Sequence, residues 1–180
     1  MAQSKITVKA RFSFVHLFKP HAMAEGQVPK YSASLLIPKS DKAAKAKIDG
    51  AIEAAKANYL EKHPGAKIPA KPRSVVYDGD GTTDSGEAFG PECRGCWVVR
   101  ASSQSKPVIV DIDKNPILDE QEVYSGCYGK AVINFYYYDT AGNKGISAGL
   151  NGVMKTADGE PLAGSAVTDS DWDDDDEDLI

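Results

Sequence analysis

The chain has 180 residues, of which 42% are hydrophobic and 26% charged, and a formal net charge of −5. This length suffices for one domain with a buried core, and no run approaches the ~18 consecutive apolar residues of a membrane-spanning helix. The N-terminus alternates in polarity without a secretory signal and only three cysteines are present, so we expect a soluble intracellular protein without a membrane partner.

Two strands are predicted in the N-terminal segment. Residues 5–14 alternate between apolar and polar side chains, which indicates a strand with one basic face and one apolar face that ends in Phe14. Residues 15–30 contain two prolines and a glycine and are expected to form a loop. Residues 31–37 form the second predicted strand.

One helix is predicted over residues 41–63, with Ser40 as its N-cap and a His-Pro-Gly stop signal at its end. Apolar side chains recur at helical spacing, and the stripe expected to pack on the body is Ala44, Ile48, Ala51, Ile52, Ala55, Tyr59 and Leu60. The lysines expected to face water are Lys42, Lys45, Lys47, Lys56 and Lys62. We therefore interpret this helix as scaffold.

Residues 64–95 are rich in Pro, Gly and Asp, which predicts a long functional loop. Strand patterns return over residues 97–103, 108–112, 130–138 and 146–154. A Gly/Asn turn over residues 139–144 predicts a hairpin between the last two. Six strands that do not alternate regularly with helices favour a mainly β fold, an OB-like small barrel with one inserted helix, and a β-sandwich is the alternative.

The last twelve residues, DSDWDDDDEDLI, carry eight acidic side chains and no basic one. Residues 1–168 contain 21 basic and 18 acidic side chains, so a body of charge +3 carries a tail of charge −8. Such a run is expected to be disordered, which suggests an OB-like domain over residues 1–155, a linker over 156–168 and a tail over 169–180.

An acidic tail on a basic body can imitate a polyanion in a basic groove, and its apolar end can dock on a partner protein. The alternative, a tail that only aids solubility, leaves the apolar end unexplained. The residues predicted to bind partners are Trp172, Asp173, Asp174, Asp175, Asp176, Glu177, Asp178, Leu179 and Ile180.

The predicted strand over residues 130–138 has two different faces. Its core face is expected to consist of Ala131, Ile133, Phe135 and Tyr137, and its other face of Lys130, Val132, Asn134, Tyr136 and Tyr138. A nonspecific binder of single strands needs cations for phosphates and flat rings for bases. The candidate residues for this role are Lys9, Arg11, Lys30, Tyr31, Arg73, Arg94, Trp97, Arg100, Lys106, Tyr128, Lys130, Tyr136, Tyr138 and Lys144. Trp97 equally fits a core position.

Two other clusters are candidate chemical sites. The C-x-x-C pair Cys93 and Cys96 has the spacing of half a zinc site or of a redox motif, but the sequence offers no second pair. The acidic residues Asp78, Asp80, Asp84 and Glu87 do not have the spacing of a calcium loop. We interpret both clusters as turns and expect no metal and no cofactor.

Several blocks of the body carry a family resemblance. They are YSGCY at 124–128, NFY at 134–136, GNKG at 142–145, GLN at 149–151, DGEPL at 158–162, DGD at 78–80, ASS at 101–103 and KP at 106–107. Together they resemble a tailed-phage family of single-stranded DNA-binding proteins. The resemblance implies an OB-fold, sequence-tolerant binding of single strands and a role in phage DNA replication, recombination or repair.

The resemblance also implies that the acidic tail recruits replication or recombination proteins in the cytoplasm of an infected bacterial host. The apolar pair Leu179 and Ile180 departs from the aromatic end of similar tails, so the partner is left open. We therefore predict a nonenzymatic protein that coats single-stranded DNA; whether it forms a homo-oligomer stays open. The alternatives are a protein-interaction module that acts through its tail and a zinc- or thiol-dependent protein.

Overall fold

The structure is a computed structural model that describes residues 3–22, 25–83, 86–140 and 142–162, so the predicted tail lies outside the described residues. The elements are β1 (Lys5–His21), β2 (Lys30–Pro38), α1 (Lys42–Lys62), β3 (Val76–Asp78), the 3₁₀ helix η1 (Pro91–Cys93), β4 (Cys96–Ser103), β5 (Val108–Val110), the 3₁₀ helix η2 (Glu120–Glu122), β6 (Tyr128–Thr140) and β7 (Asn143–Ala157). Of the helices described, none combines the length and the apolarity that a membrane crossing requires.

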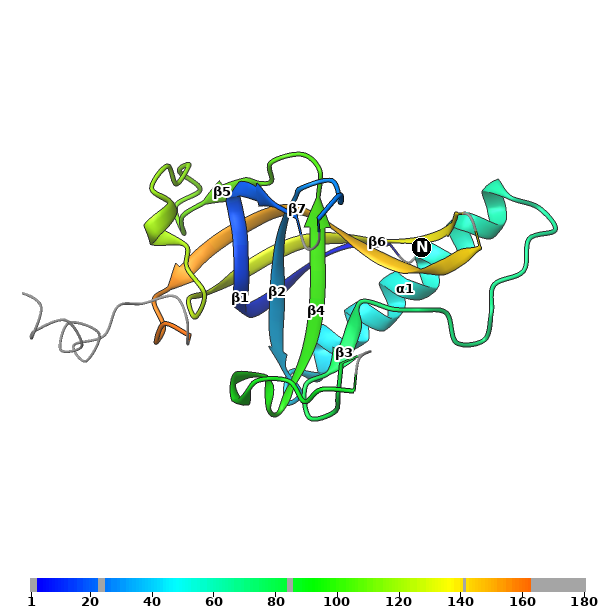
Figure 1. Ribbon diagram of the computed structural model, residues 1–180, viewed down its shortest axis with the longest axis horizontal. Helices are drawn as coiled ribbons and strands as arrows, with labels where there is room; N and C mark the ends of the chain where they lie inside the picture. The colour runs from blue at the N-terminus through cyan, green and yellow to red at the C-terminus, as the bar shows by residue number, and fades with distance from the viewer. Residues whose placement is uncertain (1–2, 23–24, 84–85, 141, 163–180) are drawn as a thin grey trace, which may run out of the picture.

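Five strands close into a barrel (Figure 1). Strand β1 is antiparallel to β2 and to β6, β2 pairs with β4, and β6 forms the predicted hairpin with β7. A parallel pairing of Ser102 on β4 with Gly149 on β7 closes the ring, while β3 and β5 attach to the outside edges of β4 and β7. This closure confirms the predicted mainly β, OB-like barrel with one helix and excludes the β-sandwich.

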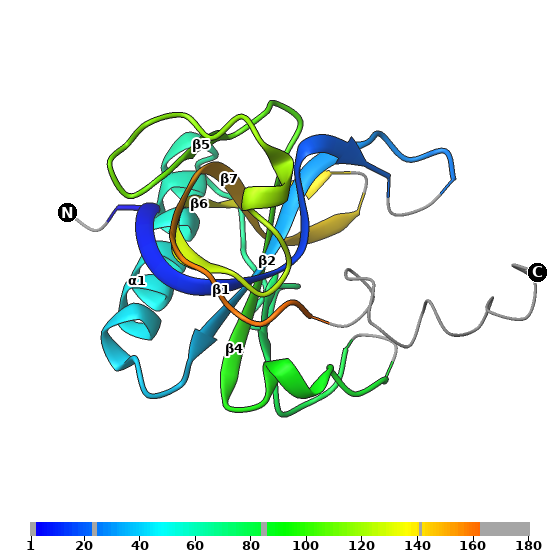
Figure 2. The same ribbon diagram turned by 90° about the vertical axis from the view of Figure 1, so that its left-hand side faces the viewer.

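The barrel interior and the helix share one hydrophobic core. The inward residues of β6 are buried as predicted, and they meet Phe12, Leu35 and Val99 from the other strands inside the barrel. Helix α1 lies against β1 and β6, on the opposite side of the barrel from the turn between β1 and β2 (Figure 2). The ring of Tyr59 packs edge-on against Tyr137, with their centroids 4.6 Å apart. The apolar stripe of the helix is therefore part of the core, as predicted.

Three details of the predicted helix are wrong. The N-cap is Asp41, whose carboxylate accepts a hydrogen bond of 3.1 Å from the amide of Ala44, because Ser40 lies one residue too far from the first turn. Leu60 is 40% exposed, whereas its neighbour Tyr59 in the same turn packs on Tyr137, so Leu60 lies at the edge of the apolar stripe. Lys45 lies over the ring of Trp97, 4.7 Å from its centroid, and does not simply face water.

The predicted loop over residues 15–30 is also wrong in its first half, because β1 continues to His21. The pairing of β1 with β2 shifts register between Ser13 and His16 and again before His21. A bulge breaks the alternation of side chains, so the period-two pattern that marks a strand disappears from the sequence there. Phe14, predicted on the apolar face, is 67% exposed.

Candidate nucleic-acid interface

A groove of about 600 Å³ lies on the outer face of β1, β2 and β4. Ser32 and Ser34 of β2 and Ser102 of β4 form its floor. The space above this floor is open because these serines alternate with core residues such as Ala33 and carry only small hydroxyl side chains on the groove side. Hydroxyl groups both donate and accept hydrogen bonds, so this floor can contact phosphates, sugars or base edges.

Two cations line the groove. Arg100 lies opposite Ser34 in the register of β4 and β2, and Lys30 lies opposite His21 where β2 begins. The guanidinium carbon of Arg100 is 5.1 Å from the ring centroid of Tyr77, which holds the side chain by a cation–π contact. Among the described residues no carboxylate lies within 4.0 Å of either cation. Both charges are therefore available to an anionic ligand.

A stacked histidine pair lies on the same strand as the groove wall. The rings of His16 and His21 are 4.2 Å apart between centroids and 8° from parallel. Burial disfavours the charged form of His16, and the nearby His21 adds repulsion, so the pKa of His16 lies below its usual value. His16 is therefore neutral at pH 7.

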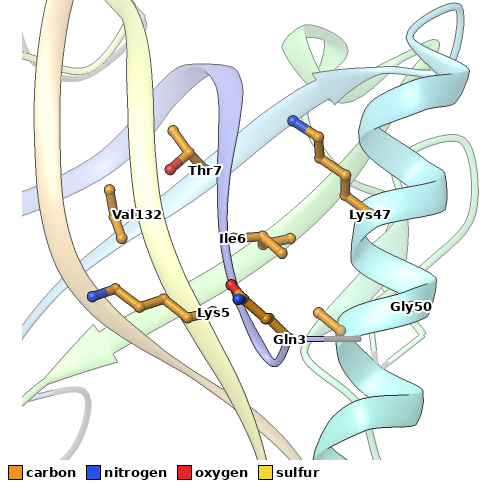
Figure 3. Close-up of a pocket in the computed structure, with 8 residues that line it drawn as sticks. Gln3, Lys5, Ile6, Thr7, Lys47, Gly50 and Val132 are labelled. Carbon is orange, nitrogen blue, oxygen red and sulfur yellow. The ribbon is translucent and has the colours of Figure 1, made fainter. Parts of the chain in front are cut away.

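Other candidate residues lie on a second surface, the outer face of β1 and β6. Lys9 stands directly opposite Lys130 in the register, a like-charge pair that is unfavourable unless an anion relieves it. Beside this pair, Lys5 of β1 and Lys47 of α1 line a separate hollow of about 690 Å³ (Figure 3). Among the described residues none of these four lysines has an ion-pair partner.

Tyr136 connects the two surfaces. Its ring, 45% exposed, projects from β6 opposite Ser147 of β7, and Ser147 lines the groove. Further along the hairpin, Tyr138 lies opposite Gly145, to which Arg73 forms a backbone bridge. Lys144 is 3.9 Å from the carboxylate of Asp139 at the hairpin end. Tyr31 and Lys106 lie near the groove without lining it: Tyr31 pairs with Ser103, and Lys106 covers the ring of Phe18.

A model of the family described as "Enterobacter phage Enc34, ssDNA-binding protein" matches residues 3–180. The chain belongs to this family. The protein of bacteriophage Enc34 solved in complex with ssDNA is 32% identical, with a TM-score of 0.77 over 89% of this chain and 90% of that one. A second structure of the same phage protein gives a TM-score of 0.74 over 94% of this chain and 89% of that one, again at 32% identity.

Two further relatives extend the comparison of this Enc34-family protein. "Putative protein p50" of Acyrthosiphon pisum secondary endosymbiont phage 1 is 34% identical over 163 residues, 87% of this chain and 85% of the relative. Gp2.5 of bacteriophage T7, a single-stranded DNA-binding protein, is 15% identical with a TM-score of 0.62 over 94% of this chain and all of that one. The T7 likeness shows a shared fold alone.

Arg11 of this Enc34-family chain has a structural role. It lies opposite Tyr128, and its guanidinium donates hydrogen bonds to the carbonyl oxygens of Gly126 at 3.0 Å and of Glu160 at 2.7 Å. The amide of Leu162 donates to the carbonyl of Ser125 at 3.0 Å. Residues 158–162, the first part of the predicted linker, are thus attached to the barrel beyond the end of β7.

Trp97 and Arg94 do not lie at the groove. Trp97 faces the core side of β4, where Lys39 and Lys45 cover its ring at 4.9 Å and 4.7 Å from the centroid. Arg94 follows η1 at the opposite end of β4, near Asp80. The structure therefore separates these two side chains from the other candidate cations and rings.

The C-x-x-C pair forms a tight corner. A Cβ atom on Gly79 would lie 2.0 Å from the carbonyl oxygen of Cys93 and 2.6 Å from that of Cys96, so only glycine fits between them. Burial raises the pKa of the Cys93 thiol to about 11, and Glu92 adds to the shift, so the thiol is protonated at pH 7. This environment does not favour thiol chemistry.

The acidic residues next to this corner form ion pairs with a lysine. Lys39 lies 2.6 Å from Asp78 and 2.8 Å from Asp80, and Asp80 also accepts a hydrogen bond from the amide of Gly95. Asp84 lies outside the described residues. Within the part of the chain that the structure describes, no group of three or more His, Cys, Asp or Glu side chains could hold a metal ion.

Sequence reasoning missed several groove residues. The alternating pattern predicts Phe14 on the core face, because a bulge cannot be recognised from that pattern. Ser32, Ser34 and Ser102 were not selected as candidate residues, because isolated serines are common in strands. The available signal was the serine alternation of β2, where every outward position of residues 32–34 is a serine. Small polar residues on the outward face of a buried strand mark an open surface.

Proposed function

We propose that this protein binds single-stranded DNA without sequence preference in the groove formed by β1, β2 and β4. The observation that carries the proposal is the pair of cations Lys30 and Arg100, free of carboxylates among the described residues, above a floor of hydroxyl groups. Positive charge along the backbone and polar groups that do not distinguish bases are what sequence-tolerant binding requires. The Enc34 relative, which was solved with ssDNA at 32% identity, supports this reading.

In this proposal the bound DNA continues out of the groove past Ser147 to Tyr136, and from there to Lys130 and Lys9. These residues continue the outer surface across β7, β6 and β1, with an exposed ring followed by the unrelieved lysine pair. A strand that follows this path crosses one site of stacking and one of phosphate contact outside the groove. Arg11 is not assigned to this path because its hydrogen bonds hold the C-terminal segment.

The acidic tail, residues 169–180, competes with DNA for these cations in our proposal and recruits replication or recombination proteins through Leu179 and Ile180. The charge of −8 on the tail against +3 on the rest of the chain supports the competition. The attachment of residues 158–162 beside Arg11 supports it further, because the chain leaves the barrel next to the strand that carries Lys9. The protein acts without enzymatic chemistry, protecting and organising single strands in phage replication, recombination or repair in the host cytoplasm.

A fluorescence polarisation titration tests the proposal. Intact protein and a 1–168 variant are titrated against a labelled single-stranded oligonucleotide, with duplex as competitor, at two salt concentrations. We expect binding that resists duplex competition and weakens with salt. Absence of binding by both forms would reject DNA binding and leave a protein-interaction module that acts through the tail.

A further inference from the structure

Phe14 has an exposed side chain and a backbone conformation that are both unfavourable for phenylalanine. Along β1 the apolar residues Val8, Ala10 and Phe12 point inward and are buried, but the ring of Phe14 is 67% exposed. Its φ angle is +47°, in the left-handed region that a bulky aromatic residue rarely adopts. Neither feature contributes to folding, so another requirement selects this conformation.

The bulge in β1 produces this exposure. The register between β1 and β2 is regular up to the pair of Ser13 with Ser34 and resumes only at His16 with Ser32. Beyond the bulge, burial resumes with Leu17, which is 1% exposed. The core is therefore complete on both sides of Phe14, and the ring is turned out of a strand whose neighbouring apolar residues are buried. Strained backbone of this kind concentrates at functional sites.

The exposed ring lies in the groove of the proposed function. Phe14 lines the same cavity as Ser32, Ser34, Lys30 and Arg100. An aromatic ring that stands beside two cations and a hydroxyl floor offers a flat apolar surface for a base while the cations take its phosphates. An apolar partner protein would find only Val28 as a further exposed large apolar side chain among the described residues that line this cavity.

We propose that Phe14 stacks on an unpaired nucleobase and that the bulge of β1 exists to present it. This inference rests on the proposed function and adds the residue that discriminates single from double strands. In a duplex the faces of the bases are covered by their neighbours, whereas in a single strand they are available to a protein ring. The phosphate contacts of Lys30 and Arg100 are common to both forms of DNA and do not provide this discrimination.

The test uses Phe14→Gly in the full-length chain. Glycine adopts φ angles near +47° without strain, and this relief offsets the greater entropy of the unfolded chain, so the variant is expected to fold and to unfold at a similar temperature. Its affinity for oligothymidylate should fall roughly 5- to 150-fold, the loss that removal of a base-stacking ring gives. Phe14→Trp should retain the affinity of the wild type. Leu118→Ala, at an apolar side chain that is 89% exposed and does not line the groove, should bind as the wild type does.

An abasic oligonucleotide of the same length separates stacking from other effects. Because it has phosphates but no bases, wild type and Phe14→Gly should bind it equally. Undiminished binding of oligothymidylate by Phe14→Gly, or an equal loss on both strands, would overturn the role of Phe14. Failure of the wild type to bind oligothymidylate would instead reject the proposed function itself.

Discussion

Arg11 and Glu160 are 149 positions apart in the sequence and are joined by a hydrogen bond of 2.7 Å from the guanidinium to the main-chain carbonyl. The same guanidinium holds the carbonyl of Gly126 and lies 5.5 Å from the ring centroid of Tyr128. Tyr124 adds a hydroxyl that accepts a hydrogen bond of 3.1 Å from the amide of Gly159. Arg11 is therefore the centre of a clasp that fixes the point where the C-terminal segment leaves the barrel.

Replacing Arg11 by alanine should open this clasp. Hydrogen bonds to a charged donor contribute about 1.5–3 kcal/mol, so the free energy of unfolding should fall by about that amount. Hydrogen exchange at the amides of Gly159 and Leu162 should accelerate. The matched control is Lys9→Ala, two residues earlier on the same strand, at a side chain with no ion pair among the described residues. Unchanged protection of both amides in the Arg11 variant would contradict the clasp.

Removing residues 169–180 should tighten DNA binding, and the gain should be largest at low salt, where the charges of the tail are least screened. A second variant keeps the length of the tail and replaces its eight acidic residues by asparagine or glutamine. This variant should bind DNA as tightly as the deletion variant does, because the competition depends on the charge of the tail. If only the deletion tightens binding, the tail obstructs DNA by its bulk; if neither does, it does not compete.

The two basic surfaces should respond differently to oligonucleotide length. OB folds cover about 4–16 nucleotides, so a strand of about 4 should occupy only the groove and one of about 16 should reach the outer face of β1 and β6. Lys30→Gln should lower the salt dependence of affinity for both, by about 0.7 in the slope of log K against log salt for each phosphate that the lysine neutralises. Lys130→Gln should act on the longer strand alone. An equal effect of Lys130→Gln on the shorter strand would move the primary site to that face.

Stability should decrease as the pH falls below the ordinary histidine pKa of 6.5. The pKa of His16 is lower in the folded protein than its ordinary value of 6.5, so the unfolded chain takes up the proton first. The stabilisation is therefore complete above pH 6.5 and is lost as the pH falls toward the folded-state pKa. His16→Gln should flatten this part of a plot of unfolding temperature against pH, and an unchanged slope would exclude His16 as the source.

Two glycine-to-alanine substitutions should change the free energy of unfolding in opposite directions. In Gly79→Ala the new methyl group would meet the backbone oxygens of Cys93 and Cys96, and we expect the free energy of unfolding to fall by about 1–3 kcal/mol, as for overpacking. Gly50 lies within α1, where an added methyl group meets nothing within 4 Å. The substitution Gly50→Ala should therefore raise the free energy of unfolding by about 0.5–1 kcal/mol. Chemical denaturation measures both. A neutral Gly79→Ala would mean that the corner can widen.

The barrel and its helix were predictable because their patterns are local. The alternation over residues 130–138 in β6 and the helical spacing from Ala44 to Tyr59 each predict burial on one face, and this burial is what the structure shows. The hairpin between β6 and β7 was predictable from its Gly/Asn turn. These features require no knowledge of distant segments.

The candidate site was less predictable because curvature and long-range pairing decide which side chains meet. Lys30 and Lys130 both belong to strands with outward cations, yet closure of the barrel places them on different surfaces. Arg11 resembles a free cation in the sequence because its acceptor, Glu160, lies near the other end of the chain. The exposure of Phe14 could not be predicted, because a bulge turns a side chain to the other face of the strand without a recognisable change in the amino-acid sequence.

The pairing of residues 5–11 in β1 with residues 128–134 in β6 has a consequence for biosynthesis. Strand β1 leaves the ribosome long before β6 and must wait about 120 residues for this second neighbour. Until then one edge of β1 is open and the inward faces of β1, β2 and β4 lack the cover that β6 and β7 provide. Folds with such distant partners form slowly and are prone to misassociation while incomplete. We expect the nascent chain to depend on chaperones until β6 emerges.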